Sequence, residues 1–209
     1  MAYLLTTLRP AAAAAGLIIS LQAFAGPLET PTVDYTQDVL VTRPTDHAFK
    51  KPERIMFAGR QIRVESVGIV TLVNLDRRDT LTLIPRVRTY WRPSKIKEPV
   101  VDARRWTGVE AQSAERVGEE TMLGRQVTKY KVRGTIFDTR IPFEGEVWTT
   151  PENIVMRVTG TGKVNGANLP VEISTVQLVI APADQRLLGV PERYGRAGGS
   201  DPNPRQEDY

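Results

Sequence analysis

The stretch GEETMLGRQVTKYKVRG, from Gly118 to Gly134, decides how the rest of the chain is interpreted. Its second half alternates apolar Tyr130 and Val132 with basic residues, which is the period-two pattern of a strand with one solvent-exposed face. Gly124 lies between two strand-like pieces, where a hairpin needs a residue that tolerates a positive φ angle. A phosphate-binding loop would need several glycines at the start of a helix, whereas this chain continues into a strand. We therefore predict a β-hairpin here.

Similar alternation recurs on both sides of this hairpin. Gly59, the polar segment 76–79 and Pro85 separate successive apolar runs upstream. Downstream, Ile154, Met156 and Val158 are expected to face one way. The run from Val171 to Ile180 is rich in β-branched residues on both faces, which predicts an internal strand. The chain is thus expected to form one mainly β domain with antiparallel strands.

The two ends of the chain differ from its middle. The first 25 residues carry one charge, Arg9, then an apolar run and Ala23-Phe24-Ala25, which is typical of a signal peptide. The apolar run is shorter than the roughly 20 residues of a membrane-spanning helix, so an uncleaved anchor is the less favoured alternative. The tail is polar and rich in glycine, which predicts disorder. The expected division is a signal peptide over residues 1–25, one β domain over 26–194 and a disordered tail over 195–209.

The composition excludes several classes of protein. Of the 209 residues, 41% are hydrophobic and 25% charged, which is ordinary for a soluble globular protein. The absence of cysteine excludes disulfides, a thiolate nucleophile and the lipidated cysteine of a bacterial lipoprotein. Together with the signal peptide, this predicts a soluble, non-lipidated periplasmic protein.

Positive charge is concentrated between residues 86 and 105, within a net formal charge of +4. Part of this region falls in an irregular stretch, residues 93–118, where a short helix is expected around Ala111 to Arg116. The cluster could attract an acidic partner or an anionic membrane surface, although charge runs more often only keep a loop solvated. Nucleic acid is not expected, because the positive excess is small. The docking candidates are Arg86, Arg88, Arg104 and Arg105.

Candidates for catalysis are few. His47 is the only histidine, so no histidine cluster can hold a metal, and its polar surroundings predict an exposed loop. Glu144 and Glu146 are two residues apart and would share a strand face as a carboxylate pair. A cation such as Lys129 could neutralise them across the sheet. We therefore expect no enzymatic activity, no metal and no cofactor.

The hairpin stretch also resembles a motif of exported proteins in the LolA/LolB-like superfamily, the outer-membrane lipoprotein carriers and their relatives. Leu83-Ile84-Pro85 ahead of Thr89-Tyr90-Trp91 resembles an upstream strand, proline turn and aromatic strand of that superfamily. Trp148 precedes a turn and an apolar strand in the same way. Pro191-Glu192-Arg193-Tyr194 resembles the terminal Pro-x-x-Tyr. The resemblance covers roughly residues 33–194.

This resemblance implies a strongly curved antiparallel sheet, a half-open barrel around a hydrophobic cavity, with short helices as a lid. Carriers of the superfamily shuttle acylated lipoproteins or other lipids, and other members are sensors or accessory proteins. No position here matches the lid-contacting arginine of the carriers, and the cysteine that anchors the receiving protein is missing.

The favoured expectation is a monomeric periplasmic binding or carrier protein for a lipid, lipoprotein or other hydrophobic ligand. The alternative is an interaction or sensor module that docks an acidic partner through residues 86–105. Apolar side chains on alternating strands either line such a cavity or fill the core. The cavity candidates are Phe57, Trp91, Trp106, Tyr130, Trp148 and Met156.

Overall fold

The structure is a computed structural model that describes residues 28–77, 79–92, 109–136 and 141–197. The first half of the chain supplies β1 (Tyr35–Arg43), β2 (Asp46–Ala58), β3 (Gln61–Ser66), β4 (Ile69–Asn74), β5 (Asp79–Ile84) and β6 (Thr89–Trp91). The second half supplies β7 (Val109–Met122), β8 (Arg125–Ile136), β9 (Ile141–Thr149), β10 (Val155–Val164), β11 (Ala167–Ile180) and β12 (Gly195–Arg196). The helices among these residues are two short 3-10 helices, η1 (Pro85–Val87) and η3 (Gln185–Leu188).

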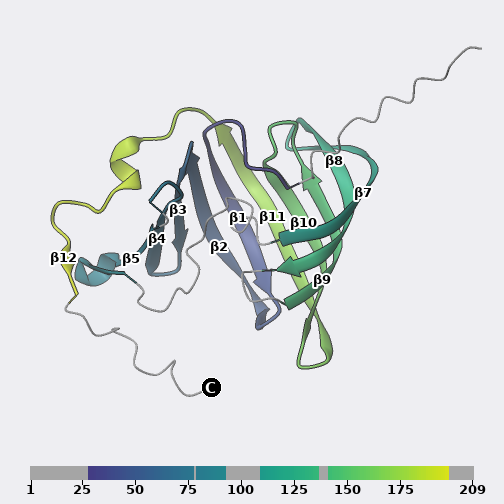
Figure 1. Cartoon of the computed structure of the whole chain (residues 1–209), viewed down its shortest axis with the longest axis horizontal. Helices are drawn as coiled ribbons and strands as arrows, with labels where there is room; N and C mark the ends of the chain where they lie inside the picture. Colours follow the sequence, from purple (N-terminus) through teal and green to yellow (C-terminus); the bar gives the residue numbers. More distant parts are fainter. Residues whose placement is uncertain (1–27, 78, 93–108, 137–140, 198–209) are drawn as a thin grey trace, which may run out of the picture.

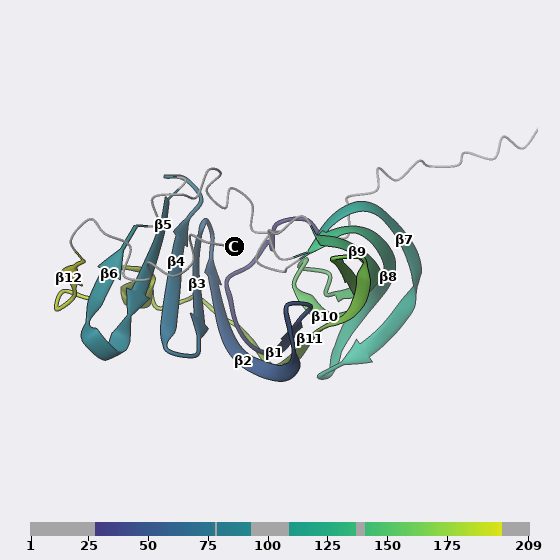
Figure 2. The same cartoon turned by 90° about the horizontal axis from the view of Figure 1, so that it is seen from below.

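These strands form one sheet in the order β12-β6-β5-β4-β3-β2-β1-β11-β10-β9-β8-β7. Neighbours are antiparallel except β6 and β12, which are parallel. The pairing of β1 with β11 joins two meanders, β1 to β6 and β7 to β11. Figures 1 and 2 show that the second meander bends strongly while the β3 to β6 part is flatter. The sheet is therefore curved and open, as the resemblance implies.

Glycines on the inner face allow this bend. Gly145 on β9 and Gly160 on β10 are directly paired. A Cβ atom added to either would overlap the backbone carbonyl oxygen of the neighbouring strand, and would lie 2.6 Å from the Phe143 ring. The ring thus covers both glycines, filling the space that side chains there would need. Two bulges in β7 add further twist to this half.

The main hydrophobic core lies on the concave face. Leu28, from the segment before β1 that runs inside the bend in Figure 2, packs into it. Tyr35 and Phe57 stack there with their ring centroids 5.6 Å apart. Burial raises the pKa of the Tyr35 phenol well above its ordinary value, so this side chain stays neutral. The most deeply buried members are Val39, Ile62, Val109, Val132, Ile136, Val147, Ile154, Val158 and Val171.

Residues 181–194, here called the C-terminal strap, cover the convex face of the flatter half. Leu188 of the strap packs with Met56 and Ala58. Val190 and Tyr194 pack against a second cluster formed by Val70, Leu72 and Leu83. Because Val73 belongs to the concave core and its neighbour Leu72 does not, the strap and the core lie on opposite faces of β4.

The predicted hairpin is confirmed. β7 ends at Met122 and β8 begins at Arg125. The two residues between them, Leu123 and Gly124, have φ angles of 50° and 74°. Positive φ at both central positions matches a type I′ turn, whose twist suits two antiparallel strands. The internal position predicted for the run from Val171 to Ile180 is also confirmed, since β11 lies between β1 and β10.

The expected helix, tail and lid need correction. The helix expected around Ala111 to Arg116 is wrong, because these residues belong to β7. The disordered tail was expected from Gly195, but Gly195 and Arg196 pair with β6 as β12. The helical lid does not occur among the described residues, where η3 lies on the convex side within the strap. The expected signal peptide and residues 198–209 lie outside the described residues.

Candidate functional site

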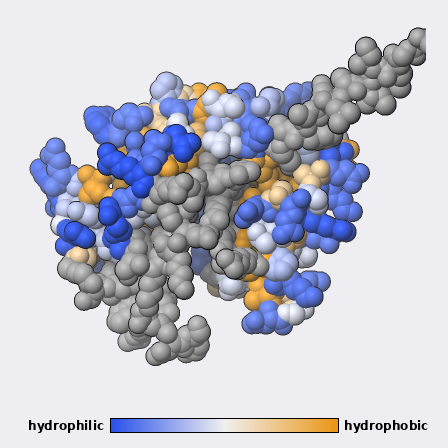
Figure 3. Space-filling model, viewed as in Figure 1, coloured by the Kyte–Doolittle hydropathy of each residue, from blue (hydrophilic) through white to orange (hydrophobic). Residues whose placement is uncertain are grey.

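The concave face is less covered towards the β7–β8 edge of the sheet. Ala111, Ala114 and Tyr130 are only half-buried there, although all three pack against the concave core. Tyr130 is paired with Arg116 across the hairpin. Figure 3 shows hydrophobic residues reaching the surface in the half of the molecule that holds β7 to β10. An apolar ligand could therefore reach the core from this side.

The predicted cavity residues do not form one cluster. Phe57 and Tyr130 belong to the concave core, whereas Trp148 and Met156 pack together with Val127 in a separate cluster. Trp91 is half-buried on β6, and Trp106 lies outside the described residues. One cavity lined by all six is therefore wrong for Trp148 and Met156, which lie outside the concave core.

Trp148 lies on the convex side of β9, because its neighbour Val147 belongs to the concave core. Lys129 on β8 and Arg157 on β10 are its cross-strand partners. The Lys129 Nζ atom and the Arg157 Cζ atom lie 5.0 and 5.2 Å from the centroid of the indole ring. Both cations stabilise the ring through cation–π contacts. The buried Trp148 Nε1 has no hydrogen-bond partner among the residues that the structure describes.

The acidic pair is engaged by cations. Glu144 and Glu146 share the convex face, and they form ion pairs with Arg133 at 3.2 Å and Lys129 at 2.8 Å. His47 is exposed as expected, but it lies in β2 instead of a loop. Within the described ranges, no group of three or more metal-ligating side chains is placed to hold a metal ion.

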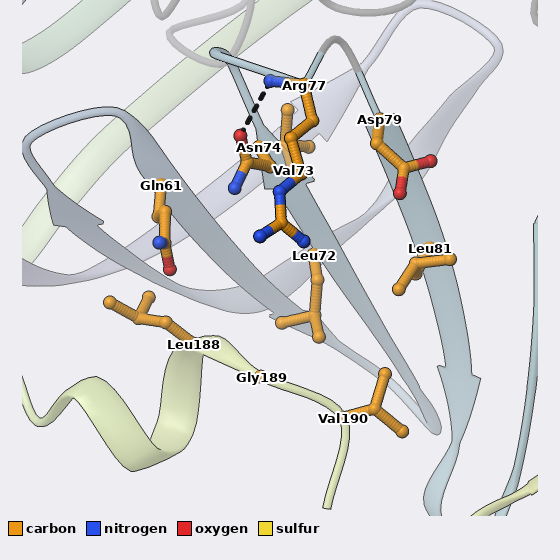
Figure 4. A pocket seen from close by; sticks show the side chains of 10 residues that line it. All are labelled: Gln61, Leu72, Val73, Asn74, Arg77, Asp79, Leu81, Leu188, Gly189 and Val190. Atoms are coloured by element: carbon orange, nitrogen blue, oxygen red, sulfur yellow. Dashed lines mark hydrogen bonds between the residues drawn. The ribbon is translucent and has the colours of Figure 1, made fainter.

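A pocket of about 230 Å³ lies between the strap and the convex face of β3 to β5, and is here called the strap pocket (Figure 4). Its apolar lining comes from Leu72, Leu81, Leu188 and Val190. Its polar lining comes from Gln61, Asn74, Arg77 and Asp79. The sequence gives little sign of this pocket, because the strap meets strands that are far away along the chain.

Four arginines gather at the β6–β12 end of the sheet, here called the basic end. Arg86 and Arg88, two of the docking candidates, are exposed on and beside η1, and their docking role stays a prediction. The backbone N–H of Gly195 donates to the Arg88 carbonyl oxygen at 3.0 Å, which brings Arg193 and Arg196 to the same end. None of the four has an ion pair with another described residue. Hydrophilic residues dominate this left-hand end in Figure 3.

Sequence reasoning missed Arg193 and Arg196, because no sequence pattern reveals a two-residue parallel strand. Arg104 and Arg105 lie outside the described residues, so their docking role stays a prediction. Across the residues that the structure describes, no helix has the length and apolar character needed to cross a membrane.

No protein-family model matches the sequence, and no curated protein matches it. Among solved structures, the chain is similar to PNGF-II at 9% identity and a TM-score of 0.41, covering 79% of this chain and 31% of that one. It is similar to MucB, solved in complex with MucA(peri), at 12% identity and a TM-score of 0.39, covering 74% of this chain and 53% of that one. The chain thus spans about a third and about half of these two proteins.

A third similar structure is an outer membrane lipoprotein-sorting protein domain from Vibrio parahaemolyticus. Its identity is 8% and its TM-score 0.33, with 76% of this chain and 91% of that one covered. At these TM-scores, none of the likenesses decides the fold or the function of this chain.

Proposed function

We propose that the protein binds a hydrophobic ligand, a lipid or the acyl chain of a lipoprotein, on the concave face of its half-open barrel. It would act as a binding or carrier protein in the periplasm, without a catalytic step. The observation that supports this proposal is an open, curved sheet whose apolar concave face is only half-covered at Ala111, Ala114 and Tyr130.

The physical basis is the burial of hydrocarbon. Each buried CH₂ group contributes about 0.8 kcal/mol, so an acyl chain needs few polar contacts to bind. An open sheet also suits a carrier, because a ligand can enter and leave at the edge without separating paired strands. The half-buried rim at Tyr130 is the part of the described concave face that suits entry.

The proposal is tested by placing a charge at that rim. Tyr130→Glu should weaken binding of a fluorescent long-chain fatty acid about tenfold or more, because a carboxylate beside the core opposes entry of an acyl chain. Binding is measured by fluorescence titration, and folding of the variant by circular dichroism.

The matched control is Ser113→Glu, which adds one carboxylate to the same hairpin at an exposed position paired with Arg133 on the other face. This control should bind the probe as the parent does. A folded Tyr130→Glu variant with unchanged affinity would contradict a ligand on the concave face.

A second function, docking of an acidic partner, is favoured by the basic end. Its four arginines are exposed, so their charge faces solvent, and among the described residues none of them has an ion-pair partner. Val87, between Arg86 and Arg88, is 59% exposed and would add apolar contact. Here residues 86–105 act together with Arg193 of the strap and Arg196 of β12, which extends the docking surface expected from the sequence.

Docking through the basic end predicts salt-dependent binding to a polyglutamate peptide. Replacing Arg193 and Arg196 by glutamine should weaken this binding about fivefold or more at low salt. The neutral glutamine side chains no longer attract the carboxylates of the peptide. Arg125→Gln with Lys163→Gln removes two charges elsewhere and should have little effect. Equal losses in the two double variants would show that net charge alone, and not the basic end, attracts the peptide.

A further inference from the structure

The strap pocket lies on the opposite face of the sheet from the proposed ligand site. Its lining is apolar on both sides: Leu72 of the floor is 5% exposed and Leu188 of the strap is 8% exposed. Leu81 and Val190 continue this surface on either side. The strap is held over it by Arg63, whose Nη1 donates to the Leu187 carbonyl oxygen at 2.9 Å. The pocket therefore has a fixed apolar floor and a tethered wall.

Hydrogen-bond donors gather at its rim. Gln61 and Asn74 are directly paired on β3 and β4, so their side chains lie in one row on the convex face. The Asn74 Oδ1 accepts from the Arg77 backbone N–H at 2.9 Å. The amide NH₂ of Asn74 is then left to donate outward. Figure 4 shows the Arg77 guanidinium reaching back over the pocket towards Leu72.

These donors have no acceptor among the described residues. No side-chain hydrogen bond or ion pair joins the Gln61 amide, the Asn74 NH₂ group or the Arg77 guanidinium to a described partner. The one acid of the rim, Asp79, is engaged by Arg92, whose Nη2 lies 2.8 Å from Asp79 Oδ2. Asp79 is thus already neutralised and repels an anion less than a free carboxylate would. The rim favours a negatively charged acceptor group.

We propose that the strap pocket binds a small amphiphilic carboxylate: its head accepts from Arg77 and the two amides, and its short alkyl tail lies on Leu72 and Leu188. A guanidinium matches a carboxylate with two parallel hydrogen bonds. The volume of about 230 Å³ lies below the roughly 300–1,000 Å³ of pockets for drug-sized ligands, which excludes a whole phospholipid. This site is separate from the proposed concave site, and either can fail without the other.

In the test, the purified full-length protein is titrated with octanoate, and binding is measured by calorimetry and by NMR of the backbone amides. Octanoate should bind and shift the amides of Asn74, Arg77 and Gly189. Arg77→Gln should weaken binding about tenfold or more, because it removes a charge-assisted hydrogen bond. Octanol, which has the same tail without the charge, should bind at least tenfold more weakly than octanoate.

Two controls separate this site from others. Arg86→Gln removes one exposed arginine at the basic end and should leave octanoate binding unchanged. Tyr130→Glu, which tests the concave site, should leave the octanoate-induced shifts of the Asn74, Arg77 and Gly189 amides unchanged. Equal binding of octanoate by Arg77→Gln and the parent would overturn the proposal, as would amide shifts confined to the concave core or no octanoate binding at all.

Discussion

Replacing Gly160 by valine should lower the free energy of unfolding by about 3 kcal/mol or more, and should leave much of the protein unfolded. The reason is the close approach of β9 and β10 at the bend. An added Cβ would overlap the Glu144 carbonyl oxygen and lie 2.6 Å from the Phe143 ring. A ring can turn away, but a paired carbonyl cannot move without breaking the ladder. Urea unfolding followed by circular dichroism measures this loss.

Gly118→Val is the matched control, because Gly118 also lies in a strand but an added Cβ there meets nothing within 4 Å. This change should alter the free energy of unfolding by less than about 1 kcal/mol. If the two variants were equally stable, close packing of Gly145 against Gly160 would not be what bends the sheet.

Trp148→Ala should lower the free energy of unfolding by about 3–5 kcal/mol, the range for removing a large buried aromatic side chain. Trp148 is 4% exposed, and it packs against Val127 and Met156 beneath two cations. Trp148→Phe should cost much less, because it keeps a ring in place and removes a buried N–H group that no described residue accepts from. Thermal unfolding of both variants gives the comparison.

This pair of variants distinguishes packing from ligand contact. If Trp148 fills the convex cluster, Trp148→Phe should bind a fatty-acid probe on the concave face as the parent does. A stable Trp148→Ala variant that no longer bound the probe would instead place Trp148 in a cavity, as expected from the sequence.

Strands in which apolar and polar residues alternate regularly could be predicted from the sequence, whereas the first part of β7, which lacks this alternation, could not. The hairpin at Gly124 follows from turn chemistry and period-two alternation, both of which are local. The sequence of the first part of β7 shows no regular alternation, because it is polar and because bulges at 111–113 and 116–118 interrupt the two-residue period of the strand. The expected helix around Ala111 to Arg116 therefore fails for an identifiable physical reason.

The candidate sites were harder to predict because they depend on which face each side chain takes. Ile154, Met156 and Val158 were expected to share a face, but the register shifts between Val155 and Arg157. As a result, Ile154 and Val158 belong to the concave core while Met156 packs beside Trp148. The strap pocket and the basic end also require the chain to return across the sheet after β11, which no local pattern encodes.

The central claim is that an acyl chain binds on the concave face, and photocrosslinking tests it most directly. The full-length protein would be loaded with a long-chain fatty acid that carries a photoreactive group near its tail, and the adducts mapped by mass spectrometry. We predict adducts on concave residues around Ala114, Tyr130 and Val132. Adducts confined to the convex face or the strap, or a protein that retains no probe, would contradict the claim.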